Sequence, residues 1–110
     1  MTSVKFLADK AGLYGFEISG HSSMNCDDEN GRIVCSAVSS AAYMAANTIT
    51  EIIGDKAEAE VSDALMHFEV INPTLTSIKV LEGLELHLTE LSVQYSNNIK
   101  IIGGAKHVKD

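Results

Sequence analysis

Residues 33–54, with the sequence IVCSAVSSAAYMAANTITEIIG, carry the helical pattern on which the predicted fold is built. Apolar and small residues recur there at steps of three and four, which places them along one face of an α-helix. The residues predicted to form this buried face are Val34, Val38, Ala41, Ala45, Thr48 and Ile52. The many alanines allow the helix to lie close to a sheet. Gly54, followed by Asp55-Lys56, predicts the end of the helix.

Two short strands are predicted before this helix. Apolar and polar residues alternate over 4–8 and again over 14–18, and the segment Asp9-Lys10-Ala11-Gly12 between them has turn-forming residues. This pattern predicts a β-hairpin. Gly20 ends the second strand, and the polar segment from there to Arg32 has no periodicity, so we expect an exposed loop.

A second hairpin, a second helix and a last strand are predicted after Gly54. Alternation over 57–61 and 66–70, with Ser62-Asp63-Ala64 between, predicts the hairpin. Asn72-Pro73 predicts a helix start, with Asn72 as N-cap and Pro73 in the first turn. The expected buried face of this helix consists of Leu75, Ile78, Leu81, Leu84, Leu88, Leu91 and Tyr95. Asn97-Asn98 ends the helix, and residues 99–102 form the last strand.

The predicted element order is therefore ββαββαβ. This order predicts an α/β (α+β) sandwich with a mostly antiparallel sheet and two helices. The length of 110 residues suits one domain over residues 1–110.

Composition narrows the classes of function. The formal net charge of −7 and the pI near 4.9 argue against direct nucleic-acid binding, which needs basic patches. Two cysteines do not make a disulfide framework, and residues 1–5 do not resemble a signal peptide. No apolar run is expected to span a membrane. We therefore expect a reduced, soluble, cytoplasmic protein that does not bind a membrane.

One cysteine and one histidine are placed for nucleophilic chemistry. Cys35 is predicted to lie in the first turn of the long helix, where unpaired backbone N–H groups and the helix dipole favour the thiolate. His21 follows Gly20 at the end of a strand, and the loop between His21 and Cys35 is long enough to bring them together. Either residue alone is more often structural. As a pair they predict a Cys–His catalytic dyad.

Gly20-His21 and the segment Ile33-Val34-Cys35-Ser36-Ala37-Val38-Ser39 resemble the ribosomal-processing cysteine protease family of bacteria. That family has a Gly-His-Ala signature, then Ile-Val-Cys-Ala-Ala-Val-Ser at a helix start. The resemblance implies that His21 and Cys35 are the catalytic dyad. The implied activity is endoproteolysis of the N-terminal extension of a large-subunit ribosomal protein, next to an aromatic residue. It also implies a homodimer, and the mechanism requires no metal or organic cofactor.

The chain differs from the family pattern at three places. Ser22 stands where the family has Ala, the loop carries an additional Cys26, and Gly31-Arg32 replaces the Asp usually found before Ile-Val-Cys. If that Asp orients the histidine, Asp27 or Asp28 is the candidate replacement here.

Several further residues are candidates for supporting roles. Backbone N–H groups near Cys35 are candidates for an oxyanion hole. The acidic segment Asp27-Asp28-Glu29 is either a solvated loop or a lid that attracts the basic tail of a ribosomal protein. The candidate substrate-binding or supporting residues are Gly20, Ser36, Ser39, Asp27 and Asp28.

Two alternatives stay open on the sequence alone. The first is a metal-binding module in which His21, Cys26 and Cys35 are ligands, with a fourth from the acidic segment 27–29, although the spacing fits no strong zinc pattern. The second is a non-catalytic ribosome-associated module on the same fold. His67, His87 and His107 are assigned no role.

Overall fold

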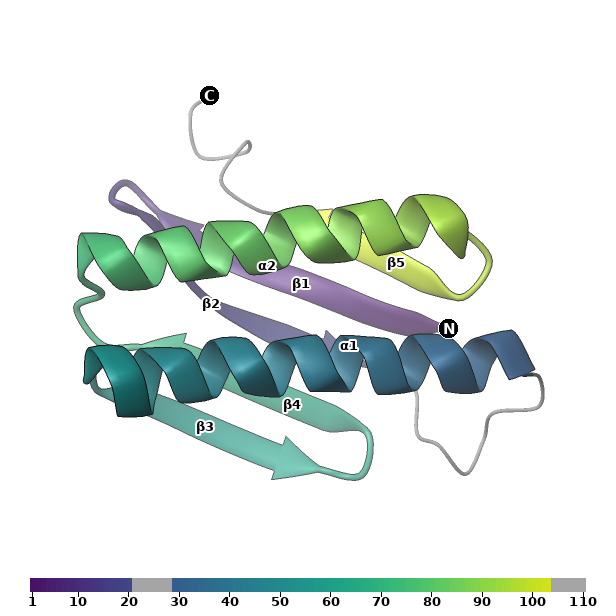
Figure 1. The fold of residues 1–110 in the computed structure, drawn as a ribbon, viewed down its shortest axis with the longest axis horizontal. Helices are drawn as coiled ribbons and strands as arrows, with labels where there is room; N and C mark the ends of the chain where they lie inside the picture. The colour runs from purple at the N-terminus through teal and green to yellow at the C-terminus, as the bar shows by residue number, and fades with distance from the viewer. Residues whose placement is uncertain (21–28, 104–110) are drawn as a thin grey trace.

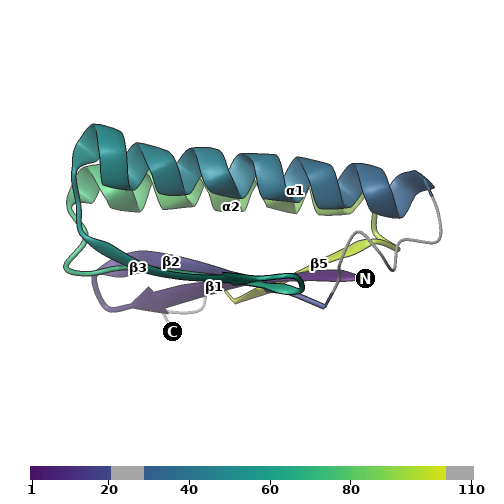
Figure 2. The same ribbon diagram turned by 90° about the horizontal axis from the view of Figure 1, so that it is seen from below.

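The described part of the chain forms a five-stranded sheet and two long helices. Figures 1 and 2 show that these helices lie on one face of the sheet. The structure, a computed structural model, describes residues 1–20 and 29–103. The elements are β1 (Thr2–Asp9), β2 (Gly12–Ser19), α1 (Glu29–Asn47), a π-helical turn η2 (Thr48–Ile53), β3 (Ala57–Ser62), β4 (Leu65–Val70), α2 (Leu75–Gln94) and β5 (Ile99–Gly103). This order confirms the predicted ββαββαβ arrangement.

The sheet has the strand order β3-β4-β2-β1-β5. Every neighbouring pair is antiparallel except β1 and β5, which run parallel, so the prediction of a mostly antiparallel sheet is confirmed. Figure 2 shows α1 and α2 on one side of the sheet, while no described element covers the other side. The fold therefore has two layers, and β3 and β5 are its edge strands.

The core lies between the helices and the inner face of the sheet. At its centre the rings of Phe16 and Phe68, on the paired strands β2 and β4, stack with centroids 5.3 Å apart. From α1, the helix predicted first, the fully or nearly fully buried residues are Val34, Val38, Ala42, Ala45 and Ala46. These small side chains allow α1 to pack closely on the strands below it.

The end of α1 differs from the predicted helical face. Ile52 was expected to be buried but is 80% exposed, whereas Ile49 is buried and Ile53 packs against the core. The cause is the π-helical turn Thr48–Ile53, because its wider turn shifts the following side chains around the axis. Gly54 ends the helix as predicted, with φ +90° and its N–H donating to the carbonyl of Ile49.

The start of α2 also differs from the prediction. Asn72 is not the N-cap, since it has φ +54°; Thr74 is the N-cap, and its side chain accepts a hydrogen bond from the N–H of Ser77. One Asp55 carboxylate oxygen accepts from the Thr74 N–H, the Thr74 hydroxyl and the buried Ser77 hydroxyl. These bonds, that of Ser77 above all, lower the pKa of Asp55. Leu75, expected in the buried face, is 70% exposed, because α2 begins only there.

The helical segment Glu29–Ile53 has the length and apolar composition of a membrane span, contrary to the expectation from the sequence. Length and composition alone are weak evidence for a membrane span, because the core helix of a soluble protein can have both. Here the segment supplies Val34, Val38 and Ile49 to the core beneath it. Packing against the sheet accounts for these apolar residues.

Candidate functional site

Cys35 lies in the second turn of α1, half-buried. The prediction that it occupies the first turn was wrong, because the described helix already begins at Glu29. An acidic residue in the first turn is favourable there, since it faces the positive end of the helix dipole. The helix start therefore lies before Cys35, and the backbone N–H groups that a helix leaves unpaired are those of its first turn.

A pocket of about 350 Å³ opens beside Cys35. Its walls come from α1, from the ends of β1 and β2, and from the hairpin β3–β4. The lining residues are Thr2, Ile18, Cys35, Ser36, Val38, Ser39, Tyr43, Val61, Ser62, Asp63, Ala64, Leu65 and Met66. The pocket thus brings the Cys35 sulfur together with both apolar and polar side chains, and its size suits the side chain and backbone of a bound peptide.

The structure brings three of the predicted site residues together. Ser36 and Ser39, which belong to the same motif, line the pocket with Cys35. His21, the predicted partner of Cys35, lies outside the described residues. Asp27 and Asp28, the other candidates, lie outside them as well.

Gly20 comes directly after β2, whose residue Ile18 lines the pocket. The backbone angle φ of Gly20 is +89°, a value that residues other than glycine rarely adopt. A Cβ added to Gly20 would lie 2.9 Å from the carbonyl oxygen of Met1. Only glycine fits here without strain. Gly20 therefore turns the chain out of the sheet at the end of the strand next to the pocket.

Sequence reasoning missed the pocket wall opposite Cys35 and also one residue of the wall that carries Cys35. Val61 and Asp63 reach the pocket from the hairpin β3–β4, and Tyr43 reaches it from α1. The signal for Tyr43 was present, because Cys35, Ser39 and Tyr43 follow one another at steps of four along one helix face. The hairpin residues carry no such local signal, since their place depends on the strand order.

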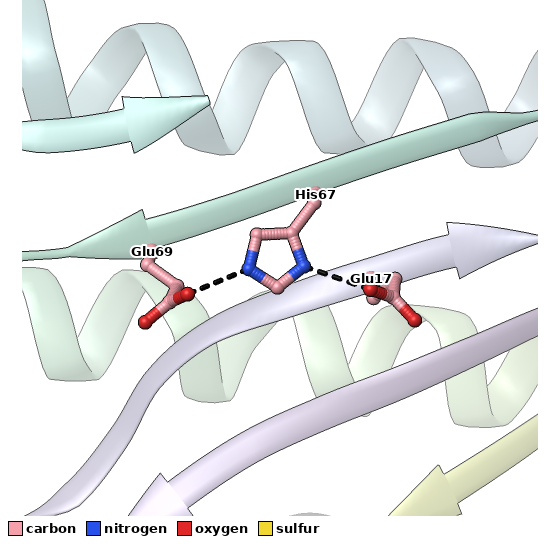
Figure 3. Close-up of polar contacts among 3 residues, drawn as sticks. All are labelled: Glu17, His67 and Glu69. Atoms are coloured by element: carbon pink, nitrogen blue, oxygen red, sulfur yellow. Dashed lines mark hydrogen bonds and ion pairs between the residues drawn. The ribbon is translucent and has the colours of Figure 1, made fainter. Parts of the chain in front are cut away.

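A second polar cluster lies on the uncovered face of the sheet, away from the pocket. Nδ1 of His67 is 2.8 Å from a Glu17 oxygen and Nε2 is 2.7 Å from a Glu69 oxygen. Figure 3 shows the imidazole ring between the two carboxylates. The hydrogen bond with Glu69, and then that with Glu17, raises the pKa of His67. Glu60 on β3 lies opposite His67 in the strand register. The contact with Glu17 joins β4 to β2, whereas the contact with Glu69 lies within β4.

This cluster predicts a stability that depends on pH. Because the folded-state pKa of His67 is raised, its contribution is full below the ordinary value of about 6.5 and is lost as pH rises through the folded-state pKa. At a pH near 5.5 we expect the parent to have a higher free energy of unfolding than a His67→Gln variant. The difference should be less than about 1 kcal/mol, because the side chains of His67, Glu17 and Glu69 are partly exposed. Urea unfolding across pH 5 to 8 measures this, and a difference that grows with rising pH would contradict it.

Among residues 1–20 and 29–103, no group of three or more His, Cys, Asp or Glu side chains is placed to hold a metal ion. The alternative of a metal-binding module requires His21 and Cys26, which lie outside that part of the chain. It therefore stays a prediction.

The half-buried thiol of Cys35 lies on the wall of a pocket in a two-layer α+β domain, an arrangement compatible with a cysteine-dependent hydrolase. Comparison with known families agrees, because residues 1–100 match the family described as cysteine protease Prp. The chain belongs to the Prp family of cysteine proteases. A search of curated proteins finds no match.

Solved structures share the fold over nearly the whole chain. SMU.848 from Streptococcus mutans has a TM-score of 0.83 at 19% identity and covers 93% of this chain and 96% of its own. The essential ribosomal processing protease Prp from S. aureus, in complex with a substrate peptide, has a TM-score of 0.83 at 15% identity and covers 92% of this chain and 97% of its own. The same protease with a covalently linked product peptide has a TM-score of 0.76 at 18% identity and covers 93% of this chain and 98% of its own. At these identities the likeness establishes the fold.

Proposed function

We propose that this protein is a cytoplasmic cysteine endopeptidase that removes the N-terminal extension of a large-subunit ribosomal protein during ribosome assembly. Its catalytic dyad is Cys35 and His21. The observation that carries the proposal is the position of Cys35, within the family motif and on the wall of the pocket. The S. aureus protease with a covalently linked product peptide supports the same reaction class.

Chain connectivity supports the dyad. Ile18 lines the same pocket as Cys35, and Gly20 turns the chain out of the sheet directly before His21. His21 is the next residue of the sequence after Gly20, and this connection supports its pairing with Cys35. No organic cofactor or metal takes part in this chemistry.

The reaction has two stages. The sulfur of Cys35, its proton taken by His21, attacks the scissile carbonyl carbon and forms a tetrahedral intermediate. His21 then gives this proton to the departing amine as the C–N bond breaks, which leaves a thioester between Cys35 and the extension. A water molecule, deprotonated by His21, hydrolyses the thioester and restores the thiol. Apolar lining residues such as Val61 and Met66 suit an aromatic side chain next to the cut bond.

The experiment is a cleavage assay on the N-terminal extension of the organism's own large-subunit ribosomal protein. A synthetic peptide of this extension is incubated with the parent protein, and the products are identified by mass spectrometry. We expect a single cut next to an aromatic residue. An intact peptide, and an intact precursor protein in the same assay, would overturn the proposed function and favour the non-catalytic ribosome-associated module.

We also propose that the protein is a homodimer. A groove of about 740 Å³ between α1 and α2, with Met44 69% exposed at its rim, gives the helical layer an apolar surface to bury. Gly83 lines this groove, and a Cβ added there meets nothing within 4 Å.

Gly83→Glu is expected to give a monomer without harming the fold. The carboxylate would be buried unpaired in the dimer, whereas in the monomer glutamate is a better helix former than glycine by roughly 0.5 kcal/mol or more. Sedimentation velocity of the parent and variant measures the change. Thr89→Glu, which adds the same charge at an exposed position outside the groove, is the control and should stay dimeric. A monomeric parent would contradict the proposal.

A further inference from the structure

The outer edge of β3 is a regular strand edge with no pairing partner in the part of the chain that the structure describes. Within it, β3 pairs only with β4, through an unbroken register from Ala57 to Ser62. Every residue of β3 after Ala57 is exposed. Proteins commonly blunt such edges with proline, a bulge or an inward-pointing charge, and β3 has no proline, no bulge and only Ala57, Ala59 and Val61 on the helix side. The edge is therefore open to a further strand.

The backbone groups that this edge presents follow from the register. The N–H of Ile71 donates to the carbonyl of Lys56 at 2.8 Å, so Lys56 and Ile71 form a hydrogen-bonded antiparallel pair. Such pairs alternate along a ladder, so Glu58, Glu60 and Ser62 also direct their N–H and C=O groups toward β4. The backbone groups of Ala57, Ala59 and Val61 consequently point away from β4, toward the free edge.

The same edge leads to the candidate site. Val61 and Ser62, at the end of β3, line the pocket with Cys35. Val61 is 54% exposed and Tyr43 across the pocket is 46% exposed, so apolar surface is accessible where the strand reaches the thiol. A chain segment paired with β3 would therefore run along this edge toward the end of the strand that lines the pocket.

The negative charge near this edge indicates which kind of chain can pair with β3. Glu58 and Glu60 are exposed on β3, Asp63 lines the pocket, and the whole chain has a net charge of −7. A second copy of this chain would bring like charges to the edge, which opposes pairing. An extended peptide with apolar and basic residues fits both the backbone groups and the charge.

We propose that an extended segment of the substrate peptide adds to the sheet as a strand beside β3. It forms backbone hydrogen bonds with Ala57, Ala59 and Val61 and thereby places the scissile bond at Cys35. This inference rests on the proposed function and deepens it, because it gives the protease a recognition mode that depends on the peptide backbone as well as on side chains.

An N-methyl scan of the extension peptide tests the proposal. In an added strand, alternate peptide N–H groups face β3, so methylation at every second position removes a hydrogen bond and places a methyl group against the edge. At those positions we expect kcat/KM to fall by at least about tenfold, while the positions between them stay near the parent value and serve as matched controls. If the peptide is still cleaved but the effect of N-methylation on kcat/KM shows no two-residue period, the inference is overturned. The proposed function would then still stand.

Ala59→Pro tests the same edge from the protein side. Because the Ala59 N–H points away from β4, proline is tolerated in the strand but removes a donor from the edge and adds a ring there. We expect about tenfold or greater loss of kcat/KM for the peptide, with an unchanged melting temperature and an unchanged rate of Cys35 alkylation by iodoacetamide. Unaltered peptide cleavage in this variant would contradict the proposal.

Hydrogen exchange on the inactive Cys35→Ala protein locates the bound peptide directly. We expect the amides of Ala57, Ala59 and Val61 to exchange rapidly in the free protein and to become protected when the extension peptide is added. Protection in the free protein that rises with protein concentration would assign the edge to a second copy and overturn the inference. A parent protein that cleaves no peptide would overturn the proposed function, and this inference with it.

Discussion

Cys35→Ala is expected to lower kcat/KM for the extension peptide by about 10⁴-fold or more, because it removes the sulfur that forms the covalent intermediate in the proposed mechanism. The fold should persist, since Cys35 is half-buried and alanine is smaller and well accepted in a helix. Cleavage followed by mass spectrometry measures the loss, and circular dichroism with a thermal melt confirms that the variant is folded.

Two further variants separate a dyad from a lone thiol. His21→Ala should lose activity by a comparable factor, and the double variant with Cys35→Ala should be no worse than either alone, because the two residues act as a unit. Iodoacetamide labelling gives an independent measurement. It reacts with the thiolate, so labelling of Cys35 at mildly acidic pH should be rapid in the parent and slow in His21→Ala. Cys26→Ser should behave as the parent in both experiments.

The contrary results are equally specific. A Cys35→Ala protein that cleaves the peptide at the parent rate would remove Cys35 from the mechanism. Labelling of Cys35 that is indifferent to His21, in a protein that cleaves the peptide, would show that the histidine is not the base. Loss of bound zinc on Cys26→Ser would instead favour the metal-binding module.

The strands and helices were predictable because their signals are local. Alternation such as Phe16 and Ile18 within β2, or Met66 and Phe68 within β4, specifies a strand with one buried face whatever the rest of the chain does. Three errors arose where the local apolar pattern does not decide the outcome. Asp55, far from Thr74 in sequence, moves the start of α2, and the π-helical turn turns Ile52 outward. The helix α1 begins at Glu29, before the apolar pattern that predicted it.

The site was predictable on one side only. Cys35, Ser36 and Ser39 lie next to one another on one helix, so a motif identifies them together. The opposite wall, with Val61 and Asp63, exists because β3 and β4 extend the sheet beyond β2. Strand order depends on packing between elements that are far apart in sequence, which no local pattern encodes. The open edge of β3 could not be predicted from the sequence for the same reason.

Phe16→Ala is expected to lower the free energy of unfolding by about 3–5 kcal/mol, a large share of the roughly 5–15 kcal/mol that stabilises a domain. The Phe16 side chain is fully buried and stacks on Phe68, so alanine leaves a cavity at the centre of the sheet and removes an aromatic pair. Urea unfolding, with the midpoint and slope both fitted, measures the change.

Two control variants show whether the loss of stability in Phe16→Ala comes from the core. Phe16→Leu keeps apolar volume at the same position and should cost less than half as much, while Leu75→Ala, at a residue that is 70% exposed, should change stability by no more than about 0.5 kcal/mol. A Phe16→Ala protein no less stable than Leu75→Ala would contradict the position of the core. Because Ile18 follows Phe16 on the same face of β2 and lines the Cys35 pocket, the core beneath that strand also supports the site. Folded Phe16→Ala molecules should therefore cleave the extension peptide with a raised KM, since the cavity leaves the floor of the pocket less firmly packed.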